Sequence, residues 1–379
     1  IWITSPTKRE RCRSTWRFRI RLVLVELTQL WLSENHRVND QRPPLMWKWV
    51  VGASAVIVVL ALGALAWFWQ DMENSLRTPL ALSAPLTLTV ESGMTIGLIG
   101  ERLAVQGILE TPHYLEIEAR RNGVSRRIKR GEYEITPGMN PRQLLAKIVA
   151  GEVIEYSITF IEGWRFRDIR EALAGNPNLD RMLTGVSDEQ VMERLGEPQR
   201  HPEGLFFPDT YRFRAETSDL QVLRRARRRM QIMLSKRWQE RVDGLPYESP
   251  YDALIMASII EKETGLAAER ADISGVFVRR LRARMRLQSD PTVIYGMGDE
   301  FDGNIRRGDL QTNTAYNTYV HRGLPPTPIA MPGDGAINAA LNPAAGSAFY
   351  FVAKGDGSHH FSSSIEEHNR AVRQYQKRR

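Results

Sequence analysis

Hydrophobic and polar positions divide the chain into one unbroken apolar run near its start and a long amphipathic remainder. Residues 49–69 contain no charged side chain, and about 20 such residues are enough to cross a bilayer. Trp47 and Trp49 flank one end of the run, and Trp67 and Trp69 flank the other, as in the aromatic belts of membrane helices. The pattern predicts a single transmembrane helix.

The charges on either side of this run predict its orientation. Arg42 and Lys48 precede the run, whereas Asp71 and Glu73 follow it. The positive-inside rule then places the N-terminus in the cytoplasm and everything after the run on the far side of the inner membrane, in the periplasm. The alternative is a cleaved signal peptide. The run is long for one and no small-x-small cleavage site closes it, so residues 46–70 are expected to remain as an anchor.

Residues 1–45 do not fit the rest of the chain. The sequence begins with Ile1, and its first methionine is Met46. We therefore expect Met46 to be the true start and residues 1–45 to be an extension of the gene model, the alternative being a basic cytoplasmic tail. This stretch carries nine basic and four acidic residues, which supplies +5 of the formal net charge of +8. The remainder is only mildly basic, so composition gives no support to nucleic-acid binding.

The chain has a single cysteine, Cys12, and it lies in the stretch before Met46. The part expected outside the cytoplasm therefore has neither a disulfide nor a thiolate metal site. The seven histidines include no pair at the spacing of a zinc protease, and no glycine-rich phosphate loop with a lysine occurs. We expect no metal and no cofactor.

After the anchor, strand patterns alternate with helix patterns, which predicts an α+β fold. Residues 71–85 are expected to be a polar linker, and residues 86–160 a first module. Within it the pattern predicts strands over 86–90, 131–135 and 154–161, and helices from Thr95, from Pro112 to Arg120, and over 141–150. A strand followed by a Glu-Gly type of turn and a helix occurs twice. This order resembles LysM-like peptidoglycan-binding modules, the alternative being an ordinary α+β domain.

Residues 161–379 are expected to form a second, mixed α+β domain. A long helix is predicted from Asp219 to about Val242, and it carries five arginines between positions 224 and 229. Such a charge run is usually a solvated face, and a surface for anionic lipid or an acidic partner is the alternative. The last segment predicts a hairpin within residues 349–361, followed by a final helix.

One carboxylate in this domain has the setting of a general acid. A helix is predicted from a Ser249 cap to a stop at Gly265, and Glu261 shares one of its faces with Ala257 and Ser258. These small residues are expected to leave room for a substrate. The apolar surroundings should desolvate the carboxyl and raise its pKa, so that it can protonate a glycosidic oxygen. The alternative is a solvated glutamate at a helix end.

Three other segments, 201–211, 285–296 and 314–328, combine aromatic rings with amides, hydroxyls and carboxylates. Rings that stack on sugar faces and polar groups that bond sugar hydroxyls suit a carbohydrate. The candidates for contacting substrate or orienting Glu261 are Gln288, Asp290, Tyr316, Asn317 and Ser258. Asp290 is either a second carboxylate of the site or the cap of a turn before a proline, and we favour the turn.

Four sequence blocks carry a family resemblance. They are Ala257-Ser-Ile-Ile-Glu-Lys-Glu-Thr264, Leu287-Gln-Ser-Asp-Pro-Thr-Val-Ile-Tyr-Gly296, Thr314-Ala-Tyr-Asn-Thr-Tyr319 and Gly323-Leu-Pro-Pro326. In their order they resemble the signature blocks of the YceG-like family of membrane-anchored endolytic murein transglycosylases, over about residues 46–375. The resemblance implies that residues 161–379 are catalytic. It also implies that Glu261 is the catalytic residue.

The resemblance further implies how one carboxylate could suffice. A lytic transglycosylase protonates the glycosidic oxygen, and the same group then deprotonates the 6-hydroxyl of the sugar, which leaves a 1,6-anhydro-muramoyl end. Glu263, about 160° from Glu261 around the helix, is expected to contact protein instead. Peptidoglycan strands and peptidoglycan synthases are the implied partners. The alternatives are a two-carboxylate hydrolase that uses Asp290, and a non-catalytic wall-binding scaffold.

Overall fold

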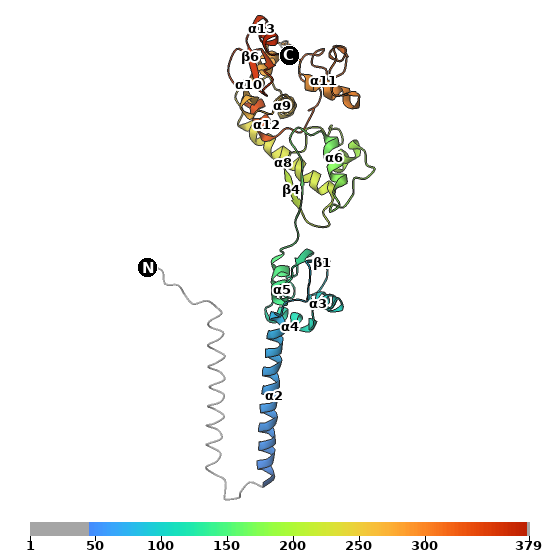
Figure 1. Cartoon of the computed structure of the whole chain (residues 1–379), viewed down its shortest axis with the longest axis vertical. Helices are drawn as coiled ribbons and strands as arrows, with labels where there is room; N and C mark the ends of the chain where they lie inside the picture. Colours follow the sequence, from blue (N-terminus) through green and yellow to red (C-terminus); the bar gives the residue numbers. More distant parts are fainter. Residues whose placement is uncertain (1–44, 377–379) are drawn as a thin grey trace, which may run out of the picture. The chain divides into compact units, whose positions relative to one another are not determined.

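The computed structural model describes residues 45–376 (Figure 1). These residues belong to two compact units, the first ending at Thr78 and the second beginning at Pro79. The expectations for residues 1–45 lie outside the described residues, apart from Leu45. Helices and strands are mixed along the described chain, which confirms the α+β class.

Helix α2 (Leu45–Arg77) is the only helix described in the first unit. Its apolar side chains from Trp49 to Trp67 are exposed on every side, with Ile57, Trp49 and Trp67 at 65–75% exposure, whereas Met72 and Leu76 near its end are buried. The stretch Trp49–Arg77 is long and apolar enough to cross a membrane. A helix that is apolar on every face has no amphipathic stripe for packing on a water-soluble core.

The second unit begins with a small core of its own. Strands β1 (Leu86–Val90) and β2 (Gly131–Ile135) pair antiparallel. Helices α3 (Ile96–Val105), α4 (Pro112–Arg121) and α5 (Pro141–Ala150) pack around them. The caps explain these boundaries: the Thr95 hydroxyl accepts the Leu98 N–H at 3.3 Å, and Gly151 ends α5 with a φ of 75°. The predicted strands over 86–90 and 131–135 and the helix over 141–150 are confirmed.

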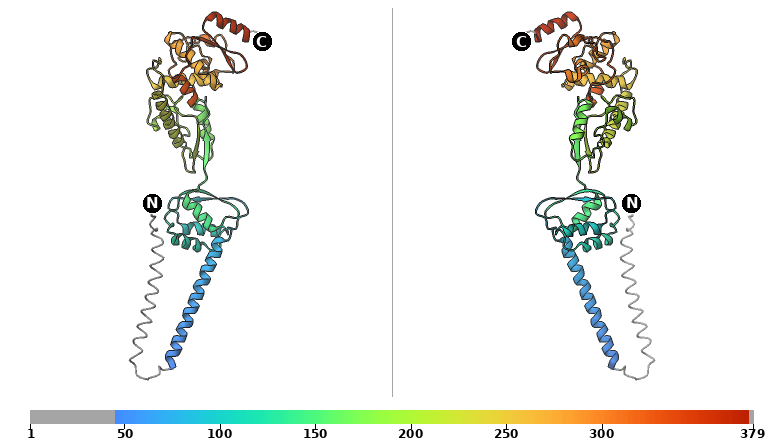
Figure 2. Two further views of the ribbon diagram at one scale, coloured as in Figure 1. Left: turned by 90° about the vertical axis from the view of Figure 1, so that its left-hand side faces the viewer. Right: turned by 90° about the vertical axis from the view of Figure 1, so that its right-hand side faces the viewer.

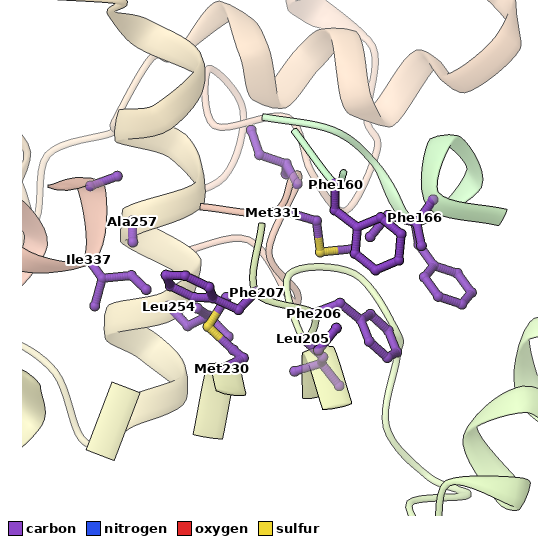
Figure 3. Packing of buried hydrophobic residues seen from close by; sticks show 14 of the residues in the cluster. Phe160, Phe166, Leu205, Phe206, Phe207, Met230, Leu254, Ala257, Met331 and Ile337 are labelled. Carbon is purple, nitrogen blue, oxygen red and sulfur yellow. The ribbon is translucent and has the colours of Figure 1, made fainter. Parts of the chain in front are cut away.

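A larger core follows along the chain. Strand β3 (Tyr156–Thr159) pairs antiparallel with β4 (Thr210–Phe213), and α6 (Phe166–Gly175), α7 (Asp188–Arg194) and α8 (Asp219–Gln239) lie along this stretch. Figure 3 shows part of the core, where Phe160, Phe166, Phe206 and Phe207 converge with Met230 of α8 and with Met331 from far along the chain. Burying several large aromatic side chains stabilises this region most.

Helix α9 (Pro250–Glu263) runs through the middle of that core. Ser249 and Asp252 form a capping box at its start, with Pro250 at its first position. Every residue from 253 to 260 is buried. Helices α10 (Arg270–Arg282) and α12 (Asp334–Leu341) pack against it. Because α9 is packed against both of these helices, its last turn is held in fixed surroundings.

The chain ends in a hairpin and a helix. Strand β5 (Tyr350–Ala353) pairs with β6 (His359–Ser362), and α13 (Ile365–Tyr375) packs on both strands, as the red segment of Figure 2 shows. The hairpin turn uses Gly355 and Gly357 at φ near 90°, which only glycine adopts at no cost. The predicted hairpin and final helix are confirmed.

Some predicted boundaries are wrong. Helix α8 ends at Gln239, before the predicted Val242, because the backbone N–H of Glu240 closes it on Lys236 and Arg237. The predicted turn before Pro291 is the start of α11 (Asp290–Met297), in which the proline occupies the first turn, where its missing N–H costs nothing. Within residues 45–376 there are also three short 3-10 helices: η1 (Ala267–Glu269), η2 (Gly298–Glu300) and η3 (Asp309–Gln311).

Candidate active site

The last turn of α9 carries two glutamates that face opposite sides of the helix. Glu261 and Glu263 are two positions apart, so their side chains diverge by about 160°. Each carboxyl is desolvated, yet the surroundings on the two sides differ completely. Their comparison shows which of the two lies beside a cleft.

The Glu261 carboxylate is fully engaged with protein groups. Its side chain is 6% exposed, and its Oε1 lies 3.3 Å from Nη2 of Arg270. Its Oε2 accepts the backbone N–H of Gly333 at 2.9 Å. The same Arg270 Nη2 lies 3.8 Å from Glu162. Burial raises the pKa of Glu261, against the effects of the Gly333 hydrogen bond and the Arg270 charge. The predicted desolvation is confirmed, and the carboxylate joins three segments of the chain.

The space expected beside Glu261 is not present. Ala257 and Ser258 are both 0% exposed. The Ser258 hydroxyl donates to the Ile255 carbonyl at 2.7 Å and accepts the N–H of Ile329 at 3.0 Å. The segment that begins at Ile329 and reaches Gly333 therefore packs on the small residues. The prediction of open space was wrong because small side chains here admit backbone instead of ligand.

Glu263 faces a cleft of about 530 Å³. Its Oε1 accepts a hydrogen bond from the hydroxyl of Ser289 at 2.5 Å. Burial raises the pKa of Glu263 to about 7, and the negative charge of Asp290 acts in the same direction, while the Ser289 hydrogen bond and the Arg280 charge oppose the rise. Near neutral pH this carboxyl is therefore divided between its acid and base forms, which suits proton donation followed by proton acceptance.

The cleft gathers polar side chains from six elements or loops. Helix α9 provides Glu263, α10 provides Arg280, and the remaining walls come from the 288–290 segment, the loop that carries Tyr319, the hairpin and α13. The residues that line it are Glu263, Arg280, Gln288, Asp290, Tyr319, Tyr350, Phe351, Val352, Ala353, His359, Ile365, His368, Asn369, Val372 and Gln376. Two predicted site residues, Gln288 and Asp290, are therefore brought together here, beside Glu263.

The backbone at Gln288 is strained. Its φ is 52°, in the left-handed region that a residue with a Cβ rarely adopts, at a cost of about 1 kcal/mol. The Gln288 N–H donates to the Thr318 carbonyl at 3.2 Å, which holds this conformation. Next to it, the Tyr319 hydroxyl donates to Oδ1 of Asp290 at 2.6 Å. Strain of this kind concentrates at functional sites, so both exposed side chains are good candidates for substrate contact.

The other two predicted residues serve the protein's own structure. Asn317 is 0% exposed, and its amide donates to the carbonyls of Asp309 and Thr312 while its oxygen accepts the Tyr319 N–H. Tyr316 packs edge-on against Tyr295 at 4.7 Å, and its hydroxyl bonds Thr327 at 2.8 Å. Asn317 thus fixes the loop that carries Tyr319, one of the cleft residues.

A third buried carboxyl lies in the loop before β4. Glu203 is 4% exposed, and it accepts the N–H of Phe166 at 3.0 Å and the hydroxyl of Tyr295 at 3.2 Å. Burial raises the pKa of Glu203 to about 7. It caps the start of α6 and lines no part of the cleft. Among the described residues, no three His, Cys, Asp or Glu side chains gather closely enough to hold a metal ion.

Sequence reasoning did not identify Glu263, Arg280, Tyr319 and His368 as cleft residues. Helical spacing showed that Glu261 and Glu263 diverge, but it gave no sign of which side another segment covers. One signal was available for Tyr319, because it ends the block that contains Tyr316 and Asn317. Nothing in the local pattern connects Arg280 or His368 with the end of α9.

Comparison with known proteins places the chain in a family. The model of the YceG-like family matches residues 88–374, which is most of the chain and includes every carboxylate described above.

The chain belongs to the YceG-like family.

An endolytic murein transglycosylase of Bacillus subtilis is 28% identical over 327 residues, which covers 80% of this chain and 88% of that protein. One of Streptococcus pneumoniae strain D39 is 22% identical over 370 residues, which covers 86% of this chain and 65% of that protein. A 2.6 Å crystal structure of a YceG-like protein from Listeria monocytogenes is 28% identical, covers 76% of this chain and 98% of that chain, and has a TM-score of 0.49.

Proposed function

We propose that the chain is a peptidoglycan lyase, an endolytic transglycosylase that cleaves the bond between N-acetylmuramoyl and N-acetylglucosamine units and leaves 1,6-anhydro-muramoyl ends. The observation that carries the proposal is Glu263, a desolvated carboxyl whose pKa is raised to about 7 and which faces an open polar cleft. Two relatives in the same family carry the name of this activity. Cleavage of nascent strands beside the synthases that make them is the role that follows.

Glu263 would act twice in one turnover. Protonated, it gives its proton to the glycosidic oxygen as the bond from that oxygen to the anomeric carbon breaks. The resulting carboxylate then takes the proton of the 6-hydroxyl as this oxygen bonds the anomeric carbon. No water is consumed and the carboxyl is regenerated. Because the nucleophile is tethered to the sugar, proximity supplies much of the rate. Ser289, bonded to Glu263 at 2.5 Å, would orient the carboxyl between the two steps.

Glu261 stays the alternative acid. The family block contains both glutamates, and the resemblance implied that Glu261 is the catalytic one. The geometry favours Glu263, because Arg270 and the Gly333 N–H occupy both oxygens of Glu261. We therefore propose that Glu261 holds the segment around Gly333 on α9, and that Glu263 performs the chemistry.

A hydrolase is the second candidate function. Asp290 lines the same cleft as Glu263, and its charge contributes to the raised pKa of Glu263. A base near an acid could activate water on the anomeric carbon, in the manner of a two-carboxylate glycosidase. The hydroxyl of Tyr319, at 2.6 Å from Asp290, would then orient that base.

The products separate these functions. The purified full chain in detergent is expected to convert peptidoglycan strands into fragments that end in 1,6-anhydro-muramoyl units. Each such end is lighter than the hydrolysed form by one water, about 18 Da, because the tethered 6-hydroxyl attacks in place of water. Mass analysis of the muropeptides measures this. Reducing muramoyl ends would instead identify a hydrolase, and intact strands would leave only a wall-binding role.

We also propose that α2 is a single-pass inner-membrane anchor with the catalytic domain in the periplasm. Its exposed apolar surface and the basic residues Arg42 and Lys48 before it support this arrangement. Protease added to spheroplasts is expected to remove the chain after Gln70. A fully protected chain would mean that the orientation is reversed.

Residues 86–160 are proposed to be a LysM-like module that binds the glycan. Its order of one strand, two helices and a returning strand, β1, α3, α4 and β2, supports this proposal. The module has its own hydrophobic core, around Leu103, Leu115 and Tyr133. A binding module on the same chain would keep the strand near the cleft and raise its effective concentration there.

A further inference from the structure

Arg280 brings a buried positive charge to the cleft that contains Glu263. The residue is 6% exposed and lines the cleft. Its Nε donates to the Phe349 carbonyl at 2.7 Å, and its Nη1 donates to the Leu287 carbonyl at 2.5 Å. In the part of the chain that the structure describes, no carboxylate forms an ion pair with it. The charge of Glu263 acts on the guanidinium only from beyond contact distance. A buried charge without a counter-ion in contact is costly, so this position suits an anion that arrives with a ligand.

His368 of α13 adds an unused polar atom beside this charge. Its ring stacks on Tyr350, with 5.3 Å between ring centroids and 28° between planes. The guanidinium carbon of Arg280 lies 5.3 Å from the centroid of the same Tyr350 ring. The Nδ1 atom of His368 is buried and has no hydrogen-bond partner within residues 45–376. With its proton on Nδ1, the ring has one hydrogen bond to offer to an acceptor in the cleft.

We propose that Arg280 and His368 form a subsite for a carboxylate on the substituent at C3 of the muramoyl sugar. The subsite rests on the proposed function, and it names the part of the substrate that the cleft recognises. The sugar backbone of the strand is uncharged, so its negative charge comes from this substituent. Two sources share the chemistry: the lactyl carboxylate of a strand without peptide, and a carboxylate of an attached peptide stem.

The other charges in the cleft determine how the substrate is oriented. Glu263 and Asp290 line the same cleft, and either carboxylate in its ionised form repels an anion. The substrate carboxylate therefore binds at Arg280, and the uncharged glycosidic bond takes the position beside Glu263. This arrangement selects the muramoyl unit over glucosamine at the site of cleavage, because only the muramoyl unit carries the substituent.

Arg279 provides a matched control within the same helix. Its guanidinium bonds the carbonyls of Ala348 at 2.6 Å and Ala344 at 3.1 Å, in the segment before β5 that Arg280 bonds through Phe349. Unlike Arg280, it does not line the cleft. A loss that follows only from detaching this segment would appear in both variants, whereas a loss of anion binding would appear only in Arg280→Gln.

The test is a binding measurement with the full chain in detergent. The probe is the disaccharide N-acetylglucosaminyl-N-acetylmuramoyl peptide, which lacks the bond that a transglycosylase cleaves. It is compared with the same disaccharide without its peptide, whose lactyl carboxylate is free, and with a form whose carboxyls are converted to carboxamides. By calorimetry, the wild type is expected to bind a carboxylate form roughly 10–100-fold more tightly than the carboxamide form, as a charged hydrogen bond predicts. The tighter of the two carboxylate forms identifies the source.

Arg280→Gln is expected to lose this preference and Arg279→Gln to keep it. His368→Phe keeps the stacking on Tyr350 but removes the donor, and it is expected to reduce the preference by about tenfold. Equal affinity of the wild type for all three forms would overturn the proposal, as would an unchanged preference in folded Arg280→Gln. If Arg280→Gln does not fold, an unchanged preference in His368→Phe overturns it.

The binding measurement, taken together with the mass analysis of muropeptides, separates this subsite from the proposed function. A wild type that produces anhydro ends but shows no carboxylate preference refutes the subsite alone. A wild type that prefers the carboxylate but does not cleave strands refutes the proposed function and leaves the subsite in place. Neither result depends on which glutamate is the acid, because the probe is not turned over.

Discussion

Replacing Glu263 by glutamine is expected to lower kcat/KM for strand cleavage by about 10²–10⁴-fold, the usual contribution of a general acid–base group. Glutamine has nearly the same shape and can still accept the hydrogen bond that Ser289 donates at 2.5 Å. It cannot give a proton to the glycosidic oxygen, nor take one from the 6-hydroxyl. The measurement is the rate of release of anhydro-muramoyl fragments by the purified full chain, with folding checked by circular dichroism.

The same substitution at Glu261 is the matched control. Glu261→Gln is expected to keep activity within about tenfold and to lose roughly 1–3 kcal/mol of stability, because it leaves the Arg270 guanidinium without the carboxylate at 3.3 Å. A folded Glu261→Gln variant without activity, together with an active Glu263→Gln variant, would reverse the two assignments. Loss of activity in Glu263→Gln and in Asp290→Asn to the same degree would favour the two-carboxylate hydrolase.

Local signals predicted the elements better than they predicted the site. The cap at Ser249, the proline after it and the apolar run through residue 260 define α9 because each acts within one or two turns of the helix. The strands over 86–90 and 131–135 followed in the same way from alternation and flanking turns. Helix α11 was not predicted, because the local sequence around a proline in the first turn of a helix looks the same as that around a proline in a loop. Only the packing of the residues that follow distinguishes the two.

The choice between Glu261 and Glu263 depends on contacts that no local pattern contains. The segment that covers Glu261 comes from Gly333, 72 positions later, and the hairpin that borders the cleft of Glu263 lies more than 80 positions away. Small residues beside Glu261 were compatible with either a substrate or a packed backbone. Ser258 decides in favour of the backbone, since its hydroxyl accepts the N–H of Ile329. The sequence therefore located the helix that carries both candidate acids, and tertiary packing distinguishes its two faces.

The raised pKa of Glu263 also makes the free energy of unfolding depend on pH. The Glu263→Gln substitution is expected to remove this dependence. Burial raises this pKa from the ordinary 4.5 to about 7 in the folded chain. Below pH 4.5 both states bind the proton, and no stability is lost. As pH rises from 4.5 to 7 the unfolded chain releases its proton first, so the free energy of unfolding falls by as much as about 3 kcal/mol, and above pH 7 it falls no further.

Glu263→Gln has no proton to lose and should escape this fall, so that the variant gains as much as about 3 kcal/mol relative to the wild type between pH 4.5 and pH 8. Urea unfolding of both proteins at pH 4.5, 6 and 8, followed by the fluorescence of Trp164 and Trp238, which pack against the large core, measures the difference. Glu203, whose pKa burial also raises to about 7, is present in both proteins, so its contribution cancels. A constant difference at all three pH values would show that the pKa of Glu263 is the same in the folded and the unfolded chain, so that the carboxyl is ionised near neutral pH and lacks the proton that an acid needs. A different outcome is a variant that is inactive and yet more stable than the wild type at pH 8. That result would show that burial of the Glu263 carboxyl, which prepares its proton for transfer, lowers the stability of the folded protein.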